Sequence, residues 1–390
     1  MLSLKSLAFV LFAANNVLAV GSPFGFASGT TGGAAVGQAT PSSAAELKSW
    51  LEDNVTRNIL LDRTYDFTDT EACSRFLLSM HGRLINPNLE IREQPLEQHV
   101  NHGIVLPTRS LHLMEQLIGA GPILHYKKAG TTAIRVKSNK TILGKGTSGW
   151  IKGKGLLLSG VSNVIIQNIR ISDINPQYVW GGDALYIDNS SKVWVSILLL
   201  RLWYSRWLTM AYNGSYRLII ITTWSTGCDG HHYWPFIFAG NGDQVTFARN
   251  YIYYTAGRGP HIGGYSGYII TVHMFNNYLN DITGHAIDAG TGAKLLAEGN
   301  YFNNVKTPST GNADGAAFAP TSSSMNSQCS STLGRNCVSN TLAGSGSLTN
   351  TANSGAISAF TASVVKSASV MDPGAVPSYV LANAGLGKVN

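Results

Sequence analysis

The feature that most constrains the fold is a short motif that recurs along the chain. It is a run of β-branched or aromatic residues, an asparagine and a further apolar pair, and it occurs in VIIQNIRI (164–171), VTFARNYIYY (245–254), ITVHMFNNYLND (270–281) and KLLAEGNYFNNV (294–305). Asn250 and Asn277 are 27 residues apart, and Asn277 and Asn300 are 23 apart. Periods of this length are typical of solenoids. The pattern predicts stacked β-coils with an asparagine at each bend, hydrogen-bonded to the coils above and below.

The alternative to a solenoid is a β-sandwich with irregular hairpins. Helical patterns are almost absent after residue 60, and the exception lies earlier, in PSSAAELKSWLEDN (41–54). There Ser43 and Glu46 match a capping box, and Leu47, Trp50 and Leu51 share one helical face. Because a solenoid exposes apolar core and unpaired backbone at its open end, we expect this helix to cap the coil.

The C-terminal part of the chain has a different composition. From about residue 320 it is rich in Ser, Thr, Ala and Gly. Low complexity alone predicts a disordered linker, but Cys329, Cys337 and the later apolar residues favour a tail docked on the body. We therefore expect residues 20–390 to form one domain that ends in this tail.

Residues 1–19 match a secretory signal peptide. Lys5 precedes the apolar stretch LAFVLFAA, and the segment ends in Val-Leu-Ala before Val20. The protein is therefore predicted to be secreted and extracellular. No later apolar run is long enough to cross a bilayer, since VSILLLRLW (195–203) is short and contains Arg201. A membrane protein is not predicted.

Four cysteines in an oxidising compartment predict two disulfides. Proximity in sequence favours Cys329 with Cys337 and leaves Cys73 to pair with Cys228. A metal site is the alternative, but none of the four belongs to a C-x-x-C pair. Secretion also makes four sequons glycosylation candidates: Asn54, Asn139, Asn189 and Asn213.

The charge pattern excludes one class of partner. The formal net charge is +7, but only 13% of the residues are charged and no long basic run is present. A nucleic-acid-binding surface normally gathers lysine and arginine on one stripe or patch. Nucleic acid is therefore not predicted as a partner.

One arginine has unusual neighbours. In YTAGRGPHIGGY (254–265), Arg258 is flanked by Gly257, Gly259 and Pro260. Glycine permits close backbone approach or positive φ, and proline fixes φ and removes a hydrogen-bond donor. An arginine that only solvates a surface does not need such geometry, so Arg258 is a candidate functional residue.

Several blocks together resemble the fungal pectin lyases of the pectate lyase superfamily. They are NKTILGKGTSGWIKGKGL, VIIQNIRISDINPQYVWGGDAL, CDGHHYW, AGRGP, GHAIDAGTGAKLLAEGNYFNNV and VPSYVLANAGLGK. The similarity runs from the leader to the C-terminus. It implies a right-handed parallel β-helix of three sheets, all-β in class, that acts on pectin as a monomer without cofactor or metal.

The resemblance also implies a reaction. The family cleaves methyl-esterified polygalacturonan by β-elimination, in which a base takes the C5 proton and the glycosidic oxygen at C4 leaves. Arg258 matches the family's catalytic arginine, which is taken to act as the base although arginine is normally always charged. We also expect Arg258 to stabilise the developing enolate.

Four further positions match the family's site. Asp183 matches an active-site acid, and a turn-capping aspartate is the alternative for it. Trp180, Tyr233 and Trp234 match cleft aromatics whose flat faces stack on sugar rings, and plain core packing is the alternative for them.

The chain departs from the family in two blocks, 73–122 and 195–226. Ungapped counting places Ser196 at a family acid and Ser205 at a second arginine, while Arg206 lies one residue away. A one-residue shift in a strand turns the side chain to the other face, so Arg206 substitutes only if the backbone bulges. His261 stands where the family has a lysine and titrates near neutrality.

The sequence therefore predicts a pectin lyase and leaves two alternatives. The first is a catalytically impaired homologue that binds pectin, which Ser196, Ser205 and His261 motivate. The second is a calcium-dependent pectate lyase, which would need several carboxylates around one cation.

Overall fold

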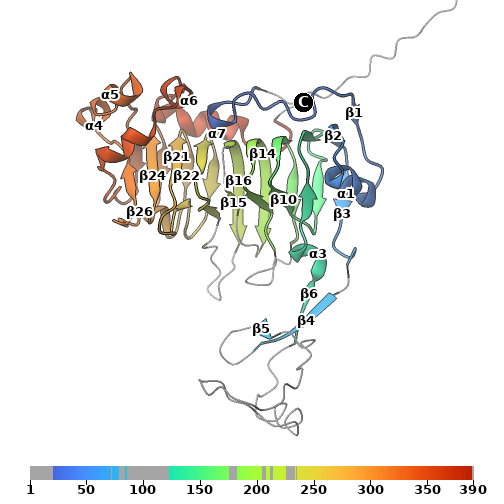
Figure 1. Cartoon of the computed structure of the whole chain (residues 1–390). Coiled ribbons are helices and arrows are strands. Elements are labelled where there is room, and N and C mark those ends of the chain that lie inside the picture. The colour runs from blue at the N-terminus through green and yellow to red at the C-terminus, as the bar shows by residue number, and fades with distance from the viewer. Residues whose placement is uncertain are drawn as a thin grey trace, which may run out of the picture.

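The computed structural model describes residues 21–71, 73–78, 84–85, 123–174, 182–203, 208–210, 214–224, 233 and 235–388. The strands wind into an elongated stack of parallel coils, with the chain progressing from one end of the stack to the other (Figure 1). The predicted signal peptide, 1–19, lies outside the described residues.

Three ladders of parallel strands run along the stack. The first ladder, which carries the candidate site, has eight strands: β7 (Ile134–Val136), β10 (Leu156–Ser159), β13 (Leu185–Asp188), β15 (Leu208–Met210), β17 (Phe236–Phe238), β20 (His261–Ile262), β23 (His285–Ala289) and β26 (Thr307–Ser309).

The second ladder consists of β1 (Gln38–Ala39), β2 (Arg57–Leu61), β8 (Lys140–Gly144), β11 (Ser162–Gln167), β14 (Ser191–Trp203), β16 (Gly214–Trp224), β18 (Gln244–Ala248), β21 (Ile270–Phe275), β24 (Ala293–Glu298) and β27 (Ala316–Phe318). The third consists of β3 (Thr64–Asp66), β9 (Trp150–Lys152), β12 (Arg170–Ser172), parts of β14 and β16, β19 (Tyr251–Tyr253), β22 (Tyr278–Asn280), β25 (Tyr301–Asn303) and β28 (Thr341–Ala343).

These ladders confirm the predicted parallel β-helix, with one difference. The second and third ladders form a single 17-stranded sheet, because β14 and β16 run through the bend that separates the ladders elsewhere. In other coils the bend residue is left-handed: φ is 56° at Asn168, 60° at Arg249 and 53° at Asn276. The matching residues in β14 and β16 are Ile197 and Leu218, types that rarely adopt positive φ. These strands therefore stay extended.

The predicted asparagine ladder is confirmed. Asn277 Oδ1 accepts hydrogen bonds from the backbone N and Nδ2 of Asn250, at 3.0 and 2.7 Å. Asn300 Oδ1 accepts the same pair from Asn277, and Asn340 Oδ1 the same pair from Asn300. All four side chains are buried, so each bend is fixed by its neighbours.

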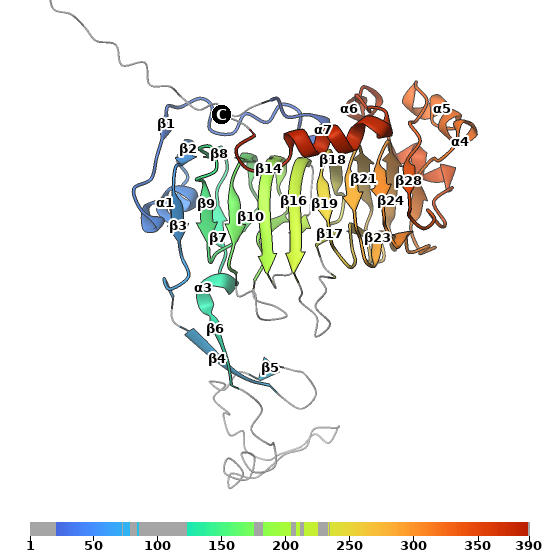
Figure 2. The ribbon, with the colours of Figure 1, turned by 180° about the vertical axis from the view of Figure 1, so that it is seen from behind.

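The predicted cap is helix α1 (Ala44–Glu52), which lies at the open end of the coil beside β3 and β7 (Figure 2). Leu47 and Leu51 are fully buried and join the core. Ser43 Oγ accepts from Glu46 N at 3.1 Å, as a capping box requires. The Glu46 carboxylate, however, accepts from the N and Oγ of Ser42, so the reciprocal half of the box uses the preceding residue.

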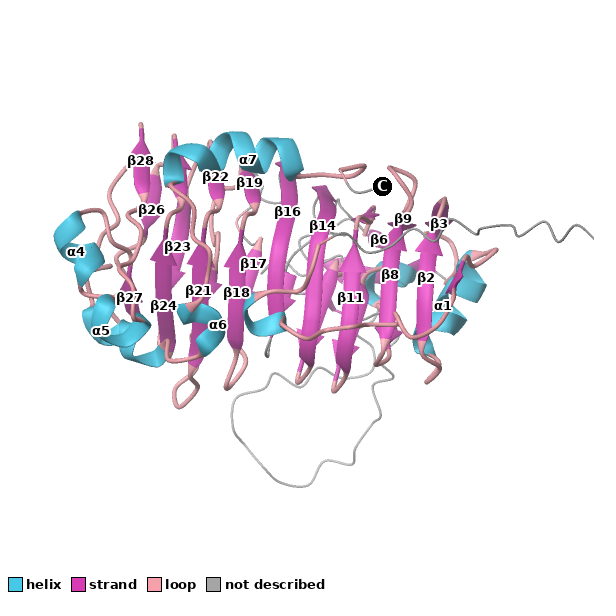
Figure 3. Cartoon of the chain, turned by 90° about the horizontal axis from the view of Figure 1, so that it is seen from above, coloured by secondary structure: helices cyan, strands magenta, loops and turns pink. Residues whose placement is uncertain are grey.

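The C-terminal segment is docked on the coil, as predicted. It contains α4 (Ser323–Ser327), α5 (Ser330–Leu333), η2 (Ser354–Ala359), α6 (Ser363–Lys366), η3 (Pro373–Ala375) and α7 (Val376–Asn383). Helix α7 lies across β19 and β22 (Figure 3), where its apolar residues pack against Tyr251, Tyr278 and Tyr301. The predicted disulfide Cys329–Cys337 is present, with the Cα atoms 5.6 Å apart.

Five minor elements complete the description. Turn η1 (Gly25–Ala27) precedes the coil, and α3 (Lys128–Thr131) follows β6. Strands β4 (Cys73–Leu78), β5 (Leu84–Ile85) and β6 (Ile123–Lys127) pair antiparallel and lie outside the stack (Figure 1). No helix of the described ranges is long and apolar enough to span a membrane.

Candidate functional site

The candidate site lies on the outward face of the first ladder. Its strands pair in register through Tyr186, Thr209, Ile237, His261 and Asp288. Tyr186, Ile237, His261 and Asp288 are partly exposed, whereas the residues that flank Tyr186 in β13 are buried. Because side chains alternate along a strand, these four partly exposed residues lie on the surface of the ladder and the buried residues that flank Tyr186 belong to the core.

Arg258 precedes β20, and its backbone is bonded to the coils on both sides. Its N–H donates to Nε2 of His285 at 3.0 Å, and its carbonyl accepts from the N–H of Phe236 at 3.2 Å. The next N–H, of Gly259, donates to the carbonyl of Ala286 at 2.8 Å. These bonds hold Arg258 at a φ of 49°, which a non-glycine residue adopts only where its surroundings impose it. The side chain is partly exposed.

The two glycines beside Arg258 have different roles. A Cβ at position 257 would lie 2.9 Å from Cε1 of His285 and 3.1 Å from the carbonyl oxygen of Tyr233, so only glycine fits without displacement. A Cβ at position 259 would meet nothing closer than 3.7 Å. Close packing therefore requires the first glycine and not the second, and the unusual φ belongs to Arg258 itself.

His261 and Asp288 form a pair next to Arg258. His261 Nδ1 lies 2.6 Å from Oδ2 of Asp288, and both side chains are mostly buried. Oδ1 of Asp288 accepts hydrogen bonds from Thr310 Oγ1 and Asn312 Nδ2. The His261 contact, helped by the other two donors, holds the pKa of Asp288 far below its ordinary value. Asp288 is thus a fixed negative charge on the ladder.

His285 is a site residue that the sequence analysis missed. Burial lowers the pKa of its imidazole, and the electrostatic effects of Arg258 and His261 lower it further, against the opposing effect of Asp288. The signal was present in the sequence: one 27-residue coil separates His285 from Arg258 and Asp288 from His261, the same step that separates Asn250 from Asn277.

Asp183 lies at the same edge of the ladder as Arg258. It precedes Leu185 by two residues. Leu185 pairs with Leu208, and Leu208 pairs with Phe236, whose strand β17 pairs with the strand of His261. β13 and β20 are three strand spacings apart, so the two backbones are separated by roughly 14 Å. Asp183 is partly exposed. The pKa of Tyr186 is raised mainly by burial, then by the charge of Asp188, and then by the charge of Asp183.

The loop after β20 exposes apolar groups that the sequence analysis also missed. Tyr265, Tyr268 and Ile269 are 58%, 40% and 56% exposed, and the two tyrosine rings are 5.5 Å apart. A Cβ at Gly264 would lie 3.4 Å from Nε2 of His261, so the loop begins against the site. The sequence signal was GGYSGYI, two tyrosines set among glycines immediately after the candidate catalytic segment.

Several predicted residues lie outside the described ranges, and their roles stay predictions: Trp180, Ser205, Arg206, Asn213, Cys228 and Trp234. The pairing of Cys73 with Cys228 stays a prediction for the same reason. Tyr233 is partly exposed, with its carbonyl against Gly257. The other sequon asparagines, Asn54, Asn139 and Asn189, are exposed.

Ser196 does not lie at the site. It is fully buried in β14 of the second ladder, where its Oγ accepts from Nε2 of Gln167 at 2.9 Å. The ungapped comparison that placed Ser196 at an active-site acid is therefore not informative about the cleft. The serine belongs to the polar interior of a neighbouring ladder.

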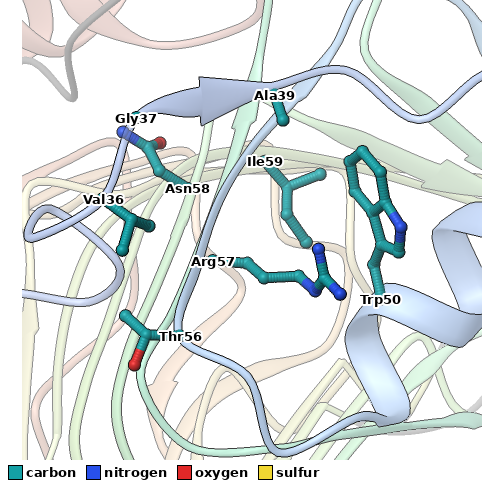
Figure 4. Close-up of a pocket in the computed structure, with 8 residues that line it drawn as sticks. All are labelled: Val36, Gly37, Ala39, Trp50, Thr56, Arg57, Asn58 and Ile59. Carbon is teal, nitrogen blue, oxygen red and sulfur yellow. The ribbon is translucent and has the colours of Figure 1, made fainter.

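A separate pocket of about 200 Å³ lies beside the capping helix, lined by residues of α1, β1 and β2 (Figure 4). Its cation, Arg57, lies 4.9 Å from the centre of the Trp50 ring and forms an ion pair with Asp53. The pocket is thus on the second ladder, apart from Arg258. Among the described residues, no group of three or more His, Cys, Asp or Glu side chains could hold a metal ion.

Comparison with known proteins agrees with this architecture. The sequence model of the pectate lyase family matches residues 117–200 and 237–389. Probable pectin lyase F-2 of Aspergillus terreus is 41% identical over 382 residues, which cover 95% of this chain and 74% of the relative. Probable pectin lyase A of Neosartorya fischeri is 38% identical over 395 residues, 99% of both chains.

Solved structures share the fold at lower identity. A Bacillus pectate lyase in complex with trigalacturonate has a TM-score of 0.55 and 21% identity, covering 95% of this chain and all of its own. A pectate lyase of Xanthomonas campestris has a TM-score of 0.54 and 18% identity, covering 94% and 99%. With these matches over nearly its whole length, the chain belongs to the pectate lyase family, and within it to the fungal pectin lyases.

Proposed function

We propose that this chain is an extracellular pectin lyase that cleaves methyl-esterified galacturonan by β-elimination at Arg258. The observation that carries the proposal is the held conformation of Arg258, a partly exposed residue just before β20, three residues before His261, which pairs with Asp288. Relatives named as probable pectin lyases, about 40% identical over most of the chain, support the same reaction.

The chemistry follows from the acidity of the C5 proton. The ester carbonyl makes that proton acidic only if the negative charge that develops on the enolate is stabilised. The base takes the C5 proton, the C5–H electron pair forms the C4–C5 double bond, and the glycosidic C4–O bond breaks. In the proposal the side chain of Arg258 faces the methyl ester carbonyl. Its neutral guanidine form takes the C5 proton, the guanidinium that results pairs with the enolate, and the departing C4 oxygen is protonated from solvent.

The charges beside Arg258 favour an esterified substrate. Asp288 is ionised and lies one strand from His261, so the positive charge of the guanidinium is partly balanced. The carboxylates of a pectate chain would be repelled by Asp288. Calcium-dependent lyases offset such repulsion with a bound cation, which they hold with several oxygen ligands. A neutral methyl ester meets no such repulsion, and Tyr265 and Tyr268 offer it exposed aromatic faces.

The other predicted substrate contacts complete this proposal. Asp183 would bind sugar hydroxyls at the far side of the cleft, and Trp180, Tyr233 and Trp234 would stack on sugar rings. Arg206 would add a second cation. Substitution of each by alanine, followed by measurement of KM, tests these assignments.

The impaired homologue is the less favoured alternative. Ser196 no longer supports it because that residue is buried in another ladder, and relatives at about 40% identity are named pectin lyases. His261 remains a difference from the family lysine, but it is anchored to Asp288.

The ultraviolet absorbance of the unsaturated product tests the proposed function. Purified protein should release it from highly methylated pectin at the same rate with and without a chelator, and far more slowly from de-esterified polygalacturonate. Absence of signal from folded protein at every pH would support the impaired homologue. A signal on polygalacturonate that a chelator abolishes would support the calcium-dependent pectate lyase.

We also propose secretion as a monomer after cleavage before Val20, with a Cys73–Cys228 disulfide and glycans on sequon asparagines. N-terminal sequencing, peptide mass spectrometry and the sedimentation of the secreted protein test these points separately.

A further inference from the structure

We propose that His285 is a positioning residue that holds Arg258 in its catalytic conformation only while its imidazole is neutral, so that protonation of His285 sets an acid limit on activity. The inference rests on the proposed role of Arg258 and adds a residue and a pH dependence to it.

The hydrogen bond between the two residues fixes the protonation state of the histidine. Nε2 of His285 accepts the N–H of Arg258 at 3.0 Å, so this nitrogen carries no proton. A neutral imidazole then has its proton on Nδ1. The imidazolium has N–H groups at both positions and accepts nothing, so protonation and this hydrogen bond exclude each other.

The bond matters because Arg258 has a conformation that its own chemistry disfavours. Its φ of 49° is imposed by three hydrogen bonds, two of them between backbone groups. The third is the bond to His285, and of the three it is the one that a proton can break. The absence of a Cβ at Gly257 lets the imidazole approach, since that atom would lie 2.9 Å from Cε1.

Among the described residues, the charged and titratable groups around His285 come from three positions. Arg258 precedes β20, His261 lies in β20, and Asp288 shares β23 with His285. On the other side, β26 places Thr307 in register with His285, and Tyr233 contributes a carbonyl beside Gly257. Burial, together with the electrostatic effects of Arg258 and His261, outweighs Asp288, so the pKa of His285 is lowered and the ring is neutral at neutral pH.

Acidification has two effects in the same direction. Below the pKa of His285 the N–H of Arg258 loses its acceptor, and a positive charge appears on the imidazole beside the guanidinium. Both effects displace Arg258 from the geometry that the elimination needs. Activity should therefore fall with a slope of one proton on the acid side of its optimum.

Two substitutions separate positioning from titration. His285→Leu removes the acceptor at every pH, and kcat should fall about tenfold with KM changed less than about twofold. His285→Gln places a carboxamide oxygen where Nε2 lies and does not titrate. It should retain most of kcat and lose the acid limb. A wild-type kcat in the leucine variant, or an unchanged acid limb in the glutamine variant, would overturn the proposal.

His261→Gln identifies which histidine titrates. Of the described residues, His261 supplies the other imidazole near Arg258. The His261→Gln variant should keep an acid limb, whatever its effect on kcat. If the acid limb disappears in His261→Gln and persists in His285→Gln, His261 is the titrating group and the proposal fails. A cooperative thermal unfolding transition establishes that each variant is folded. If His285→Leu does not fold, His285→Gln alone tests the proposal.

A nuclear magnetic resonance titration gives a readout that needs no activity. In the wild-type protein, the chemical shift of the Arg258 amide proton should change with pH at the same pKa as the His285 imidazole. This pH dependence should be absent in His285→Gln. If the wild type makes no unsaturated product but the amide titrates, the proposed function fails and the hydrogen bond stands. If the chemical shift of the Arg258 amide proton does not change while His285 titrates, the inference itself is contradicted.

Discussion

His261 Nδ1 and Asp288 Oδ2 lie 2.6 Å apart on adjacent strands of the first ladder, three residues after Arg258 and His285 in their respective coils. The two pairs share the 27-residue step of the solenoid. A repeat that stacks strands therefore also stacks the charged and titratable groups of the site. A substitution in one of these coils should therefore alter the paired residue in the next coil.

Asp288→Asn tests this coupling. Loss of the charge should lower kcat/KM about tenfold, because Asp288 orients His261 through a charge-assisted hydrogen bond. Asp288 also raises the pKa of His285, so its removal should move the acid limit of activity to lower pH. Asp314→Asn, at an exposed aspartate beyond the ladder, is the control and should leave both quantities unchanged. A wild-type pH profile in Asp288→Asn would contradict the coupling.

Gly257→Ala should reduce kcat far more than Gly259→Ala. The added Cβ at 257 would lie 2.9 Å from the His285 ring, whereas at 259 the nearest atom is 3.7 Å away. The first change displaces His285 or Arg258, and the second requires no movement. The ratio of the two kcat values at one pH measures the effect, and equal losses would show that the close packing at 257 is unimportant.

Tyr265→Ala and Tyr268→Ala should raise KM for methylated pectin severalfold with little change in kcat. Their exposed rings flank the site and are proposed to stack on sugar residues away from the reacting bond, a contact worth of the order of 1 kcal/mol. Tyr265→Phe and Tyr268→Phe keep the rings and serve as matched controls. If alanine and phenylalanine variants have the same KM, the rings do not bind substrate.

Glu298 should make stability depend on pH. Burial, the largest influence, favours the neutral carboxyl group, but hydrogen bonds from Arg335 and His273 outweigh it and lower the pKa from 4.5 to about 2. The unfolded chain therefore binds this proton more readily than the folded one. The contribution of the carboxylate, a few kcal/mol, should be complete above about pH 5 and lost as the pH falls toward 2.

Denaturation at several pH values measures this contribution. Glu298→Gln should lower the free energy of unfolding at pH 7 and flatten its decline in acid, because Arg335 then no longer ties the tail to β24 through a carboxylate. Glu52→Gln, at a partly exposed residue paired with Lys48, should retain the wild-type decline. Parallel declines in wild type and Glu298→Gln would show that another group is responsible.

The repeat accounts for what the sequence predicted well. Asparagines that recur after 27 and then 23 residues predicted the coil and the ladder from Asn250 to Asn300, because a buried amide bonded to its copies repeats with the fold. The helix over residues 44–52 and the Cys329–Cys337 disulfide were also local features, readable from spacing.

The misses came from relations between coils. The continuity of β14 and β16 depends on Ile197 and Leu218 standing where other coils have a left-handed residue, which only the register reveals. Ser196 was misplaced because counting along the chain ignores which ladder a residue enters. His285 and Asp288 were overlooked because the 27-residue step was applied to the asparagines and not to Arg258 and His261.

The most direct test of the account compares the wild type with Arg258→Ala on highly methylated pectin in the presence of a chelator. The wild type should form unsaturated product. The variant, once thermal denaturation has shown that it is folded, should form the product about a thousandfold more slowly. Equal rates in the two proteins would contradict the central claim that Arg258 carries the elimination.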